Sequence, residues 1–171
     1  MVFDQWPRNE SINEVIVKVV VLNELYRTNI YDSWTVATHI VSLNIDDRLN
    51  AGDESLVRDI ANVRLGGKQR TLLSFSTKYA GWHQPDLYQL FDSYVEYMLW
   101  RYQQSFAFSK FKRYELRDYP RFLRVVDDFR RFCGLTHVGR KDLDKFLWAE
   151  GRRLWVTKNT VDEPPLSEAS A

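Results

Sequence analysis

The sequence predicts an all-α protein, a bundle of roughly seven or eight helices joined by short turns. Apolar residues recur at helical spacing, and Asp, Asn or Ser residues that can cap helices precede several of these segments. Of the 171 residues, 44% are hydrophobic and 15% aromatic, which is typical of a globular chain. We expect residues 1–157 to form one domain, and residues 158–171, rich in Pro, Ser and acidic side chains, to form a mobile tail.

The first two helices are expected in the N-terminal quarter. Residues 9–26 carry apolar side chains largely at helical spacing, and no Gly or Pro interrupts them. The β-rich run 15–22 leaves a strand as the alternative for part of this segment. Asp32 or Ser33 is expected to cap a second helix that ends near residue 43.

The middle of the chain is punctuated by glycines and further caps. Four elements are expected in order: a short helix near 45–50, a helix from Asp53 to about 62, a tight turn at Gly66-Gly67, and a helix over 68–80. Residues 81–90 are expected to form a loop, after which Asp92 begins a helix that runs to about Gln104.

The last third combines an aromatic segment with two further helices. Residues 105–116 are aromatic and basic and are expected to form a loop, with a short helix inside it as the alternative. The run 105–114 either grips single-stranded or distorted DNA or is pinned to the core by its phenylalanines. Pro120 is expected to begin or bend a helix that ends at Cys133, before Gly134. A final helix is expected over residues 141–155.

Charge is distributed unevenly although the net charge is only +1. Residues 1–59 carry five basic and ten acidic side chains, a net of −5, whereas residues 60–114 carry eight basic and three acidic ones, a net of +5. A local basic surface of this kind suits a phosphate backbone, and chance unevenness is the alternative.

Cys133 is the only cysteine, which excludes an internal disulfide and a four-cysteine zinc or iron–sulfur site. We expect no metal and no cofactor. No apolar run approaches the ~20 residues that span a bilayer, and residues 1–10 are too polar for a signal peptide. These features predict a cytoplasmic protein that binds no membrane.

The Gly66-Gly67 turn is the first candidate for a binding site. Two glycines between helices let backbone N–H groups approach a phosphate, and Lys68 and Arg70 stand at the positive end of the helix expected to follow. An ordinary helical hairpin with glycine at its C-cap is the alternative.

The order of these segments resembles the helix-hairpin-helix DNA glycosylase superfamily, and most closely its small bacterial and archaeal members similar to 8-oxoguanine DNA glycosylase. Asn62-Val-Arg-Leu-Gly-Gly-Lys68 corresponds to the family's glycine-rich hairpin, and Phe91-Asp-Ser-Tyr-Val95 to the segment with its catalytic Asp. The upstream stretch from Leu25 to Asp32 is similar to a corner near the family's first helices. The hairpin departs from the family by lacking its Leu-Pro-Gly opening.

The resemblance implies a helix-hairpin-helix glycosylase fold and places Asp92 at the chemical centre. A carboxylate beside C1′ either stabilises the positive charge that develops when an N-glycosidic bond breaks or deprotonates the attacking group. Lys68 matches the family's lysine, whose amine attacks C1′ and forms a Schiff base, and Lys78 is a second candidate on the same expected helix. A plain N-cap remains the alternative for Asp92, and a phosphate contact the alternative for Lys68.

The resemblance also implies a double-stranded DNA partner with one base flipped out of the stack. Residues expected to contact DNA are Arg27, Asn29, Arg64, Gly66, Gly67, Arg70 and Lys78, and those expected to form the base pocket are Trp82, His83 and Tyr94. An exposed turn is the alternative for Asn29, and packing in the core is the alternative for the aromatic residues.

Three functions are compatible with these features. The first is a DNA N-glycosylase, with or without lysine-dependent lyase activity, in base-excision repair or in defence against phage DNA with hypermodified bases. The second is a non-catalytic DNA-binding module, and the third is a helical protein-interaction domain in which Asp92 only caps a helix. The resemblance favours the first and implies a nucleoid-associated protein of a bacterial or archaeal cell, with no obligate protein partner.

Overall fold

The computed structural model describes residues 2–161, with the backbone alone given for residues 158–161. The expected mobile tail therefore lies largely outside the described residues, at 162–171. Its first four residues continue the last helix, which runs from Arg140 to Val161.

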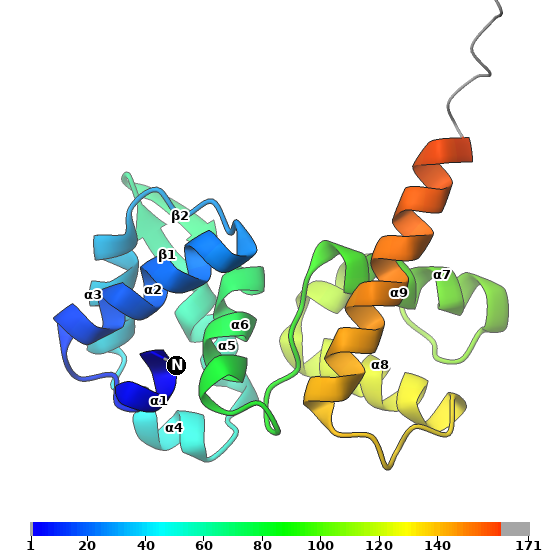
Figure 1. Ribbon diagram of the computed structural model, residues 1–171, viewed down its shortest axis with the longest axis horizontal. Helices are drawn as coiled ribbons and strands as arrows, with labels where there is room; N and C mark the ends of the chain where they lie inside the picture. Colours follow the sequence, from blue (N-terminus) through cyan, green and yellow to red (C-terminus); the bar gives the residue numbers. More distant parts are fainter. Residues whose placement is uncertain (1, 162–171) are drawn as a thin grey trace, which may run out of the picture.

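The described chain is mainly helical, as the sequence predicted, and it forms two lobes joined by residues 84–92 (Figure 1). The N-terminal lobe contains α1 (Val2–Gln5), α2 (Ile12–Tyr26), α3 (Ser33–Ser42), α4 (Asp46–Asn50), α5 (Glu54–Ala61), β1 (Asn62–Leu65), β2 (Lys68–Thr71) and α6 (Leu73–His83). The C-terminal lobe contains α7 (Ser93–Phe106), the 3₁₀ helix η1 (Arg113–Arg117), α8 (Tyr119–Phe132) and α9 (Arg140–Val161). Within the described residues, no helix combines the length and the apolar character needed to cross a bilayer.

Side-chain caps fix the starts of several helices where the sequence predicted them. Asp32 accepts a hydrogen bond from the backbone N–H of Thr35, and Asp53 accepts one from Ser55. The segment with the strand alternative is helical, since α2 is continuous from Ile12 and ends where Arg27 takes a left-handed conformation. At the other end of the chain, Asp118 caps α8 in front of Pro120.

The Gly66-Gly67 turn joins two strands, so the predicted helical hairpin at this position is wrong. Strand β1 pairs antiparallel with β2, and the pairing of Leu65 with Lys68 leaves the two glycines as a two-residue turn. Their φ angles of 55° and 77° are the positive pair that a type I′ hairpin turn requires. Helix α6 consequently begins at Leu73 and not at residue 68, and it continues through His83 into the segment predicted to be a loop.

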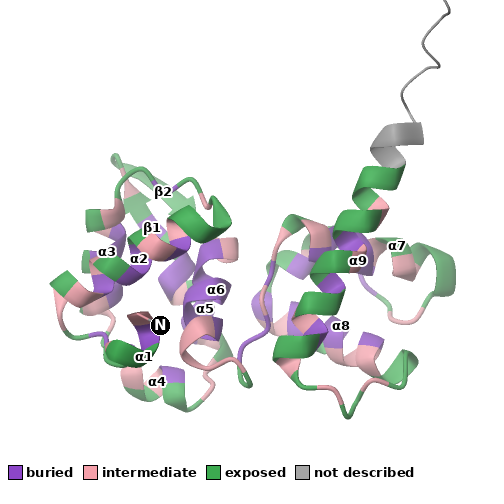
Figure 2. Cartoon of the chain, viewed as in Figure 1, coloured by how far each residue is buried: buried purple, intermediate pink, exposed green. Residues whose placement is uncertain are grey.

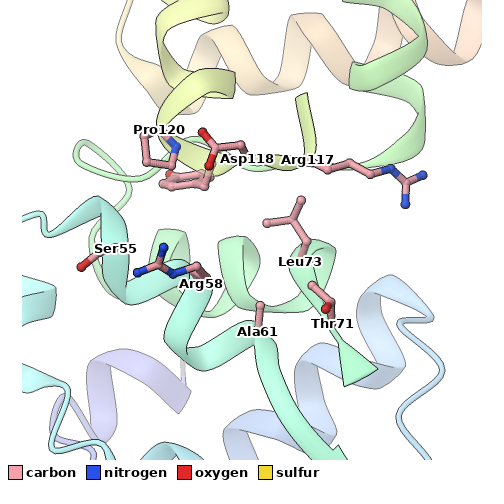
Figure 3. Close-up of a pocket in the computed structure, with 9 residues that line it drawn as sticks. Ser55, Arg58, Ala61, Thr71, Leu73, Arg117, Asp118 and Pro120 are labelled. Carbon is pink, nitrogen blue, oxygen red and sulfur yellow. The ribbon is translucent and has the colours of Figure 1, made fainter. Parts of the chain in front are cut away.

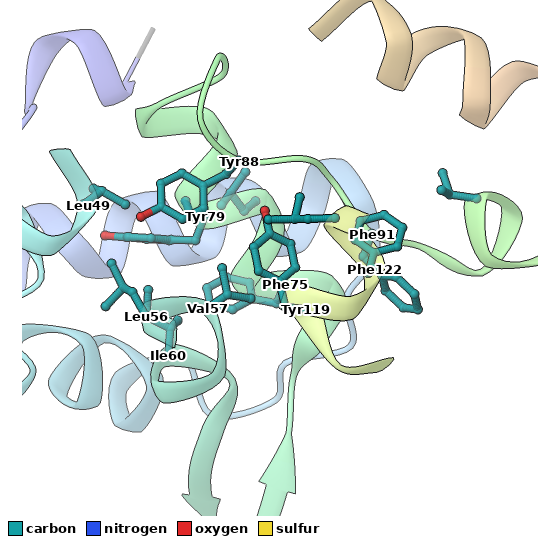
Figure 4. Close-up of a cluster of buried hydrophobic side chains, with 14 of the residues drawn as sticks. Leu49, Leu56, Val57, Ile60, Phe75, Tyr79, Tyr88, Phe91, Tyr119 and Phe122 are labelled. Atoms are coloured by element: carbon teal, nitrogen blue, oxygen red, sulfur yellow. The ribbon is translucent and has the colours of Figure 1, made fainter. Parts of the chain in front are cut away.

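One hydrophobic core runs through both lobes. Buried residues line the inward faces of the helices and the connecting segment (Figure 2). Around that segment, Tyr88 and Phe91 pack with residues of the C-terminal lobe: the Tyr88 ring centroid lies 6.4 Å from that of Tyr119, and Phe91 meets Phe122 edge-on at 5.3 Å (Figure 4). Because this core is continuous, the side chains between the lobes are held in a defined arrangement.

Candidate active site between the lobes

A cleft of about 920 Å³ lies between the lobes and receives side chains from both. The N-terminal lobe contributes the end of α2, the end of β2 and one side of α6. The C-terminal lobe contributes the start of α7, with one residue each from η1 and α9. The lining residues that matter below are Tyr26, Arg27, Ser74, Lys78, Asp92, Tyr94, Arg117 and Trp148.

Asp92 stands at the N-terminus of α7 and opens onto this cleft. Its Oδ1 accepts hydrogen bonds from the backbone N–H groups of Tyr94 and Val95, both at 2.9 Å, so the predicted cap is confirmed. The hydrogen bonds between Asp92 and the other described residues use Oδ1 alone, which leaves Oδ2 without a partner among them. Capping therefore holds the carboxylate in place without consuming its second oxygen.

Lys78 brings an amine to the same cleft from α6. The residue is only 4% exposed, and its Nζ donates to Ser74 Oγ at 2.7 Å and to the Phe91 carbonyl oxygen at 3.2 Å. The ammonium also lies 5.1 Å from the ring centroid of Tyr26. Burial lowers the pKa of Lys78, an effect that the carboxylates of Asp92 and Asp144 oppose. A lysine in this setting releases its proton more readily than a solvated one.

Asp144 is a second carboxyl group in the same electrostatic environment, and it comes from α9. Burial and the Asp92 carboxylate raise the pKa of Asp144 to about 7, although Lys78 and a hydrogen bond from Gln89 act in the opposite direction. The Gln89 side chain is fully buried and donates from Nε2 to Asp144 Oδ1 at 3.2 Å. Asp144 thus titrates near neutrality in a fixed position.

A smaller cavity of about 370 Å³ adjoins this group. Tyr26 belongs to the lining of both the cleft and the cavity, and its hydroxyl accepts a hydrogen bond from Trp82 Nε1 at 2.9 Å. Trp82, Tyr88 and Leu90 form further apolar parts of the cavity wall, and Asp144 supplies a carboxyl. Asp4, His83, Arg140, Lys141 and Lys145 line it as well, so flat aromatic walls are combined here with several polar groups, which suits a planar heterocycle that carries hydrogen-bonding atoms.

The seam between the lobes continues beyond the cleft. A hollow of about 90 Å³ lies between α5 and the start of α8, and Thr71, Leu73 and Arg117 line both this hollow and the cleft (Figure 3). Arg117 also lies 3.7 Å from the buried Glu96, which Arg113 engages at 2.8 Å. Glu96 is therefore neutralised by two arginines and differs from Asp92 in having no uncommitted oxygen.

The predicted lysine and its neighbours on the hairpin do not lie in the cleft. Lys68, Arg64 and Arg70 project from an exposed two-stranded ribbon, where Arg64 Nε donates to the Gly67 carbonyl at 3.2 Å. Lys68 is absent from the residues that line the cleft with Asp92, whereas Lys78 is among them. The sequence predicts Lys68 at the start of a helix, but the residue lies in strand β2. Of the two candidate lysines, it is Lys78 that shares the cleft with Asp92.

Four of the remaining predicted residues divide between the two hollows. Tyr94 and Arg27 line the cleft, whereas Trp82 and His83 line the smaller cavity. Asn29 is exposed, with a φ of 57°, in the turn after α2.

The aromatic–basic segment, residues 105–116, is tied to the core, because Phe111 is buried and Phe108 packs edge-on against Phe129 at 5.5 Å. Phe106 remains 57% exposed.

His83 also belongs to a polar network that sequence analysis missed. Its Nε2 lies 3.1 Å from Asn9 Oδ1, an oxygen that also accepts a hydrogen bond from Lys18 at 3.0 Å. Asn9 in turn donates from Nδ2 to Asp46 at 2.7 Å. Burial and the nearby charge of Lys18 lower the pKa of His83 to about 4, so the ring is neutral in the folded protein at pH 7.

This lowered pKa predicts an acid sensitivity of the fold. In the unfolded state His83 takes up a proton below its ordinary pKa of 6.5, whereas in the folded state it does so only near pH 4. Protonation therefore favours the unfolded state, and the stability that the neutral ring contributes above pH 6.5 is lost as the pH falls. We expect the free energy of unfolding of the wild type, relative to a His83→Gln variant, to fall by about 2 kcal/mol between pH 7 and pH 5. Urea unfolding at both pH values measures this, and His137→Gln, at an exposed histidine, is the control. A pH-independent difference would contradict the assignment.

Asp144, Gln89 and Tyr26 are the site residues that sequence analysis missed. Each lies in an ordinary context: Asp144 in a charged helix, Gln89 in an expected loop, and Tyr26 at a helix end. No local motif marks them. The acid at position 144 within an otherwise apolar helical face, between Leu143 and Leu147, is the one signal present, and it is weak.

The fold and the site together define a two-lobed helical protein with a lysine–carboxylate cleft between its lobes. The HI_0787_N family, described as an N-terminal domain, matches residues 1–87, which is the N-terminal lobe with the start of the connecting segment. The chain belongs to this family. It is also 38% identical over 145 residues to a Haemophilus influenzae protein titled "Uncharacterized protein", a match that covers 84% of this chain and 69% of that protein. No solved structure matches the chain.

Proposed function

We propose that this protein is a DNA N-glycosylase that excises a damaged or modified base, with Asp92 and Lys78 as its catalytic pair. One observation carries the proposal: a buried lysine amine and a carboxylate with an uncommitted oxygen open onto the same cleft between two lobes. The carboxylate suits the stabilisation of positive charge at C1′, and the amine suits attack on that carbon. Roles in base-excision repair and in defence against modified phage DNA both agree with this chemistry.

The proposed relationship to helix-hairpin-helix glycosylases rests on the order of a hairpin, a lysine and a helix-capping Asp. In this chain the hairpin is a β-ribbon, so backbone phosphate contacts at its glycines follow a different geometry from those of a helical hairpin. The lysine role moves from Lys68 to Lys78. Arg64, Lys68 and Arg70 then serve as phosphate contacts that position DNA over the cleft.

The activity is tested by incubating the protein with a panel of lesion duplexes and with modified phage DNAs, and by identifying released bases by mass spectrometry. We expect Asp92→Asn to lower the release of the susceptible base at least about 10²-fold, because the carboxylate charge is lost. Folding should survive, since Asn caps a helix as well as Asp does. Asp86→Asn, in the exposed loop before the site, is the matched control.

The outcomes separate the competing functions. Base release that depends on Asp92 supports a glycosylase. Salt-sensitive DNA binding without any product would indicate a non-catalytic DNA-binding module. The absence of DNA affinity at low salt would leave a protein-interaction domain, in which Asp92 serves only as the cap of α7.

The hairpin gives a separate prediction about affinity. Replacing Arg64, Lys68 and Arg70 together by Gln removes three exposed positive charges. The salt dependence of log Kd is expected to become shallower by about 3, roughly one for each phosphate that is no longer neutralised, with base release unchanged at saturating protein. Fluorescence anisotropy at several salt concentrations measures the slope. Arg124→Gln, which removes one exposed charge on α8, is the control. If its change of slope per removed charge equals that of the triple variant, only the net charge matters.

A further inference from the structure

Asp144 is a carboxyl group close to the proposed catalytic pair, and the proposed function gives it no role. It lies near the start of α9, in the wall of the smaller cavity, whereas Asp92 and Lys78 line the cleft. Tyr26 connects the two spaces: it lines both, and its ring lies against the Lys78 ammonium. The amine, the second carboxyl and the aromatic-walled cavity therefore form one continuous cluster.

Gln89 is arranged to satisfy Asp144 in both of its protonation states. Its amide Nε2 donates to the Asp144 carboxylate, while its buried Oε1 has no hydrogen-bond partner among the described residues. The oxygen and nitrogen of a side-chain amide are assigned from the hydrogen-bond network and can be exchanged by a half-turn of the amide. After that half-turn, Oε1 faces Asp144 and accepts a hydrogen bond from its protonated form. A half-buried carboxyl that has a hydrogen-bond partner both with and without its proton is suited to exchange one.

The charges around Asp144 do not fix it in one state. The titratable or charged groups that line its cavity or act on it electrostatically are Asp4, Tyr26, Lys78, His83, Tyr88, Asp92, Arg140, Lys141 and Lys145. Burial and Asp92 favour the neutral acid, whereas Lys78 and the Gln89 amide favour the anion. The resulting pKa near neutrality follows from this balance.

We propose that Asp144 is the general acid–base group of this site, which takes a proton from Lys78 and delivers it to the leaving base, held in the cavity beside Tyr26 and Trp82. This inference rests on the proposed glycosylase function and adds a third residue to it. The proposal places the base in the smaller cavity and the attacking amine in the cleft, on opposite sides of the glycosidic bond that breaks.

The proton balance of the step is complete within these groups. The Lys78 ammonium gives a proton to the Asp144 carboxylate, and the freed amine forms a bond to C1′. The C1′–N glycosidic bond breaks, its electron pair goes to the base, and the base takes the proton from Asp144. The lysine nitrogen, now bonded to C1′, passes one of its protons to O4′ as the C1′–O4′ bond opens, which leaves a protonated imine.

The test is the pH dependence of borohydride trapping on a duplex with a single abasic site, followed by base release on any duplex that the wild type processes. We expect Asp144→Asn to slow trapping at pH 7 by about tenfold or more, and to abolish the inflection near pH 7. The deficit should shrink by pH 9–10, where solvent deprotonates Lys78 directly. Asp144→Glu should restore part of the rate, and Asp142→Asn, an exposed acid on the same helix that pairs with Lys145, should behave as the wild type.

Each contrary result overturns the proposal in a recognisable way. If Asp144 acts only through its charge, Asp144→Asn lowers the pKa of Lys78 and speeds trapping below pH 7. If it is only structural, the rate falls equally at every pH, or the melting temperature and DNA Kd change with it. If the wild type traps nothing, the lysine chemistry of the proposed function has failed first. If the wild type traps and Asp144→Asn has the same profile, the inference alone has failed.

Discussion

Replacing Lys78 by methionine is expected to abolish trapping and reduce base release by at least about 10³-fold, since no other lysine of the described residues lines the cleft. The same change should leave the free energy of unfolding unchanged or raise it by about 1 kcal/mol, because a buried ammonium is replaced by an apolar side chain of similar length. Removal of the cation favours the protonated form of Asp144, so no buried anion is left uncompensated. Loss of activity without loss of stability is the signature of a residue retained for chemistry.

The measurements are borohydride trapping on an abasic duplex and urea unfolding of the same preparations. Lys68→Met is the matched variant, because Lys68 is the residue that the sequence itself favoured and lies exposed on the hairpin. It should trap normally at saturating DNA. Trapping that disappears in Lys68→Met and persists in Lys78→Met would assign the nucleophile to the hairpin instead of the cleft.

Gly151→Ala is expected to destabilise the protein by about 3 kcal/mol. Gly151 is buried in α9 where this helix crosses α7, and a Cβ added there would lie 2.3 Å from the Tyr94 carbonyl oxygen. The two nearest opposing atoms belong to the backbone and the third is the Tyr94 Cβ, so no side chain can rotate away to make room. The helices must separate, which moves the start of α7, with Asp92 and Tyr94, away from the α9 residues Asp144 and Trp148.

Thermal and urea unfolding measure the loss of stability, and base release under native conditions measures the displacement of the site. Gly139→Ala is the control, because an added Cβ there meets nothing within 4 Å; as the residue before α9, where Gly is favoured over Ala, it should lose at most about 1 kcal/mol. If the two variants were equally stable, the close approach of α7 and α9 would not be required for the fold.

The hairpin shows how a correct local signal can receive the wrong interpretation. The Gly-Gly pair predicts a tight turn, and it forms one, but the residues on each side are strands. Two glycines between Val63-Arg64-Leu65 and Lys68-Gln69-Arg70 agree with a two-residue β-turn at least as well as with a helical hairpin. Pairing across the turn, together with burial of Val63, favours the strands over the helix extension that the sequence predicted.

The sequence by itself determined the features that depend on neighbours along the chain. Helix starts at Asp32, Asp53 and Asp92 follow from one side chain and the N–H groups two or three residues later, so they could be located without the fold. The mainly helical class follows from apolar spacing in the same way.

Only the tertiary structure decided which groups share the site. Lys78 and Asp144 come from helices far apart in the chain, and the shifts in their pKa values arise from burial by residues of several elements. Desolvation and charge proximity depend on how the lobes pack, which no local spacing encodes. The sequence therefore points to Asp92 and offers two lysines, whereas packing places Lys78 with Asp92 in the cleft and adds Asp144 to the site.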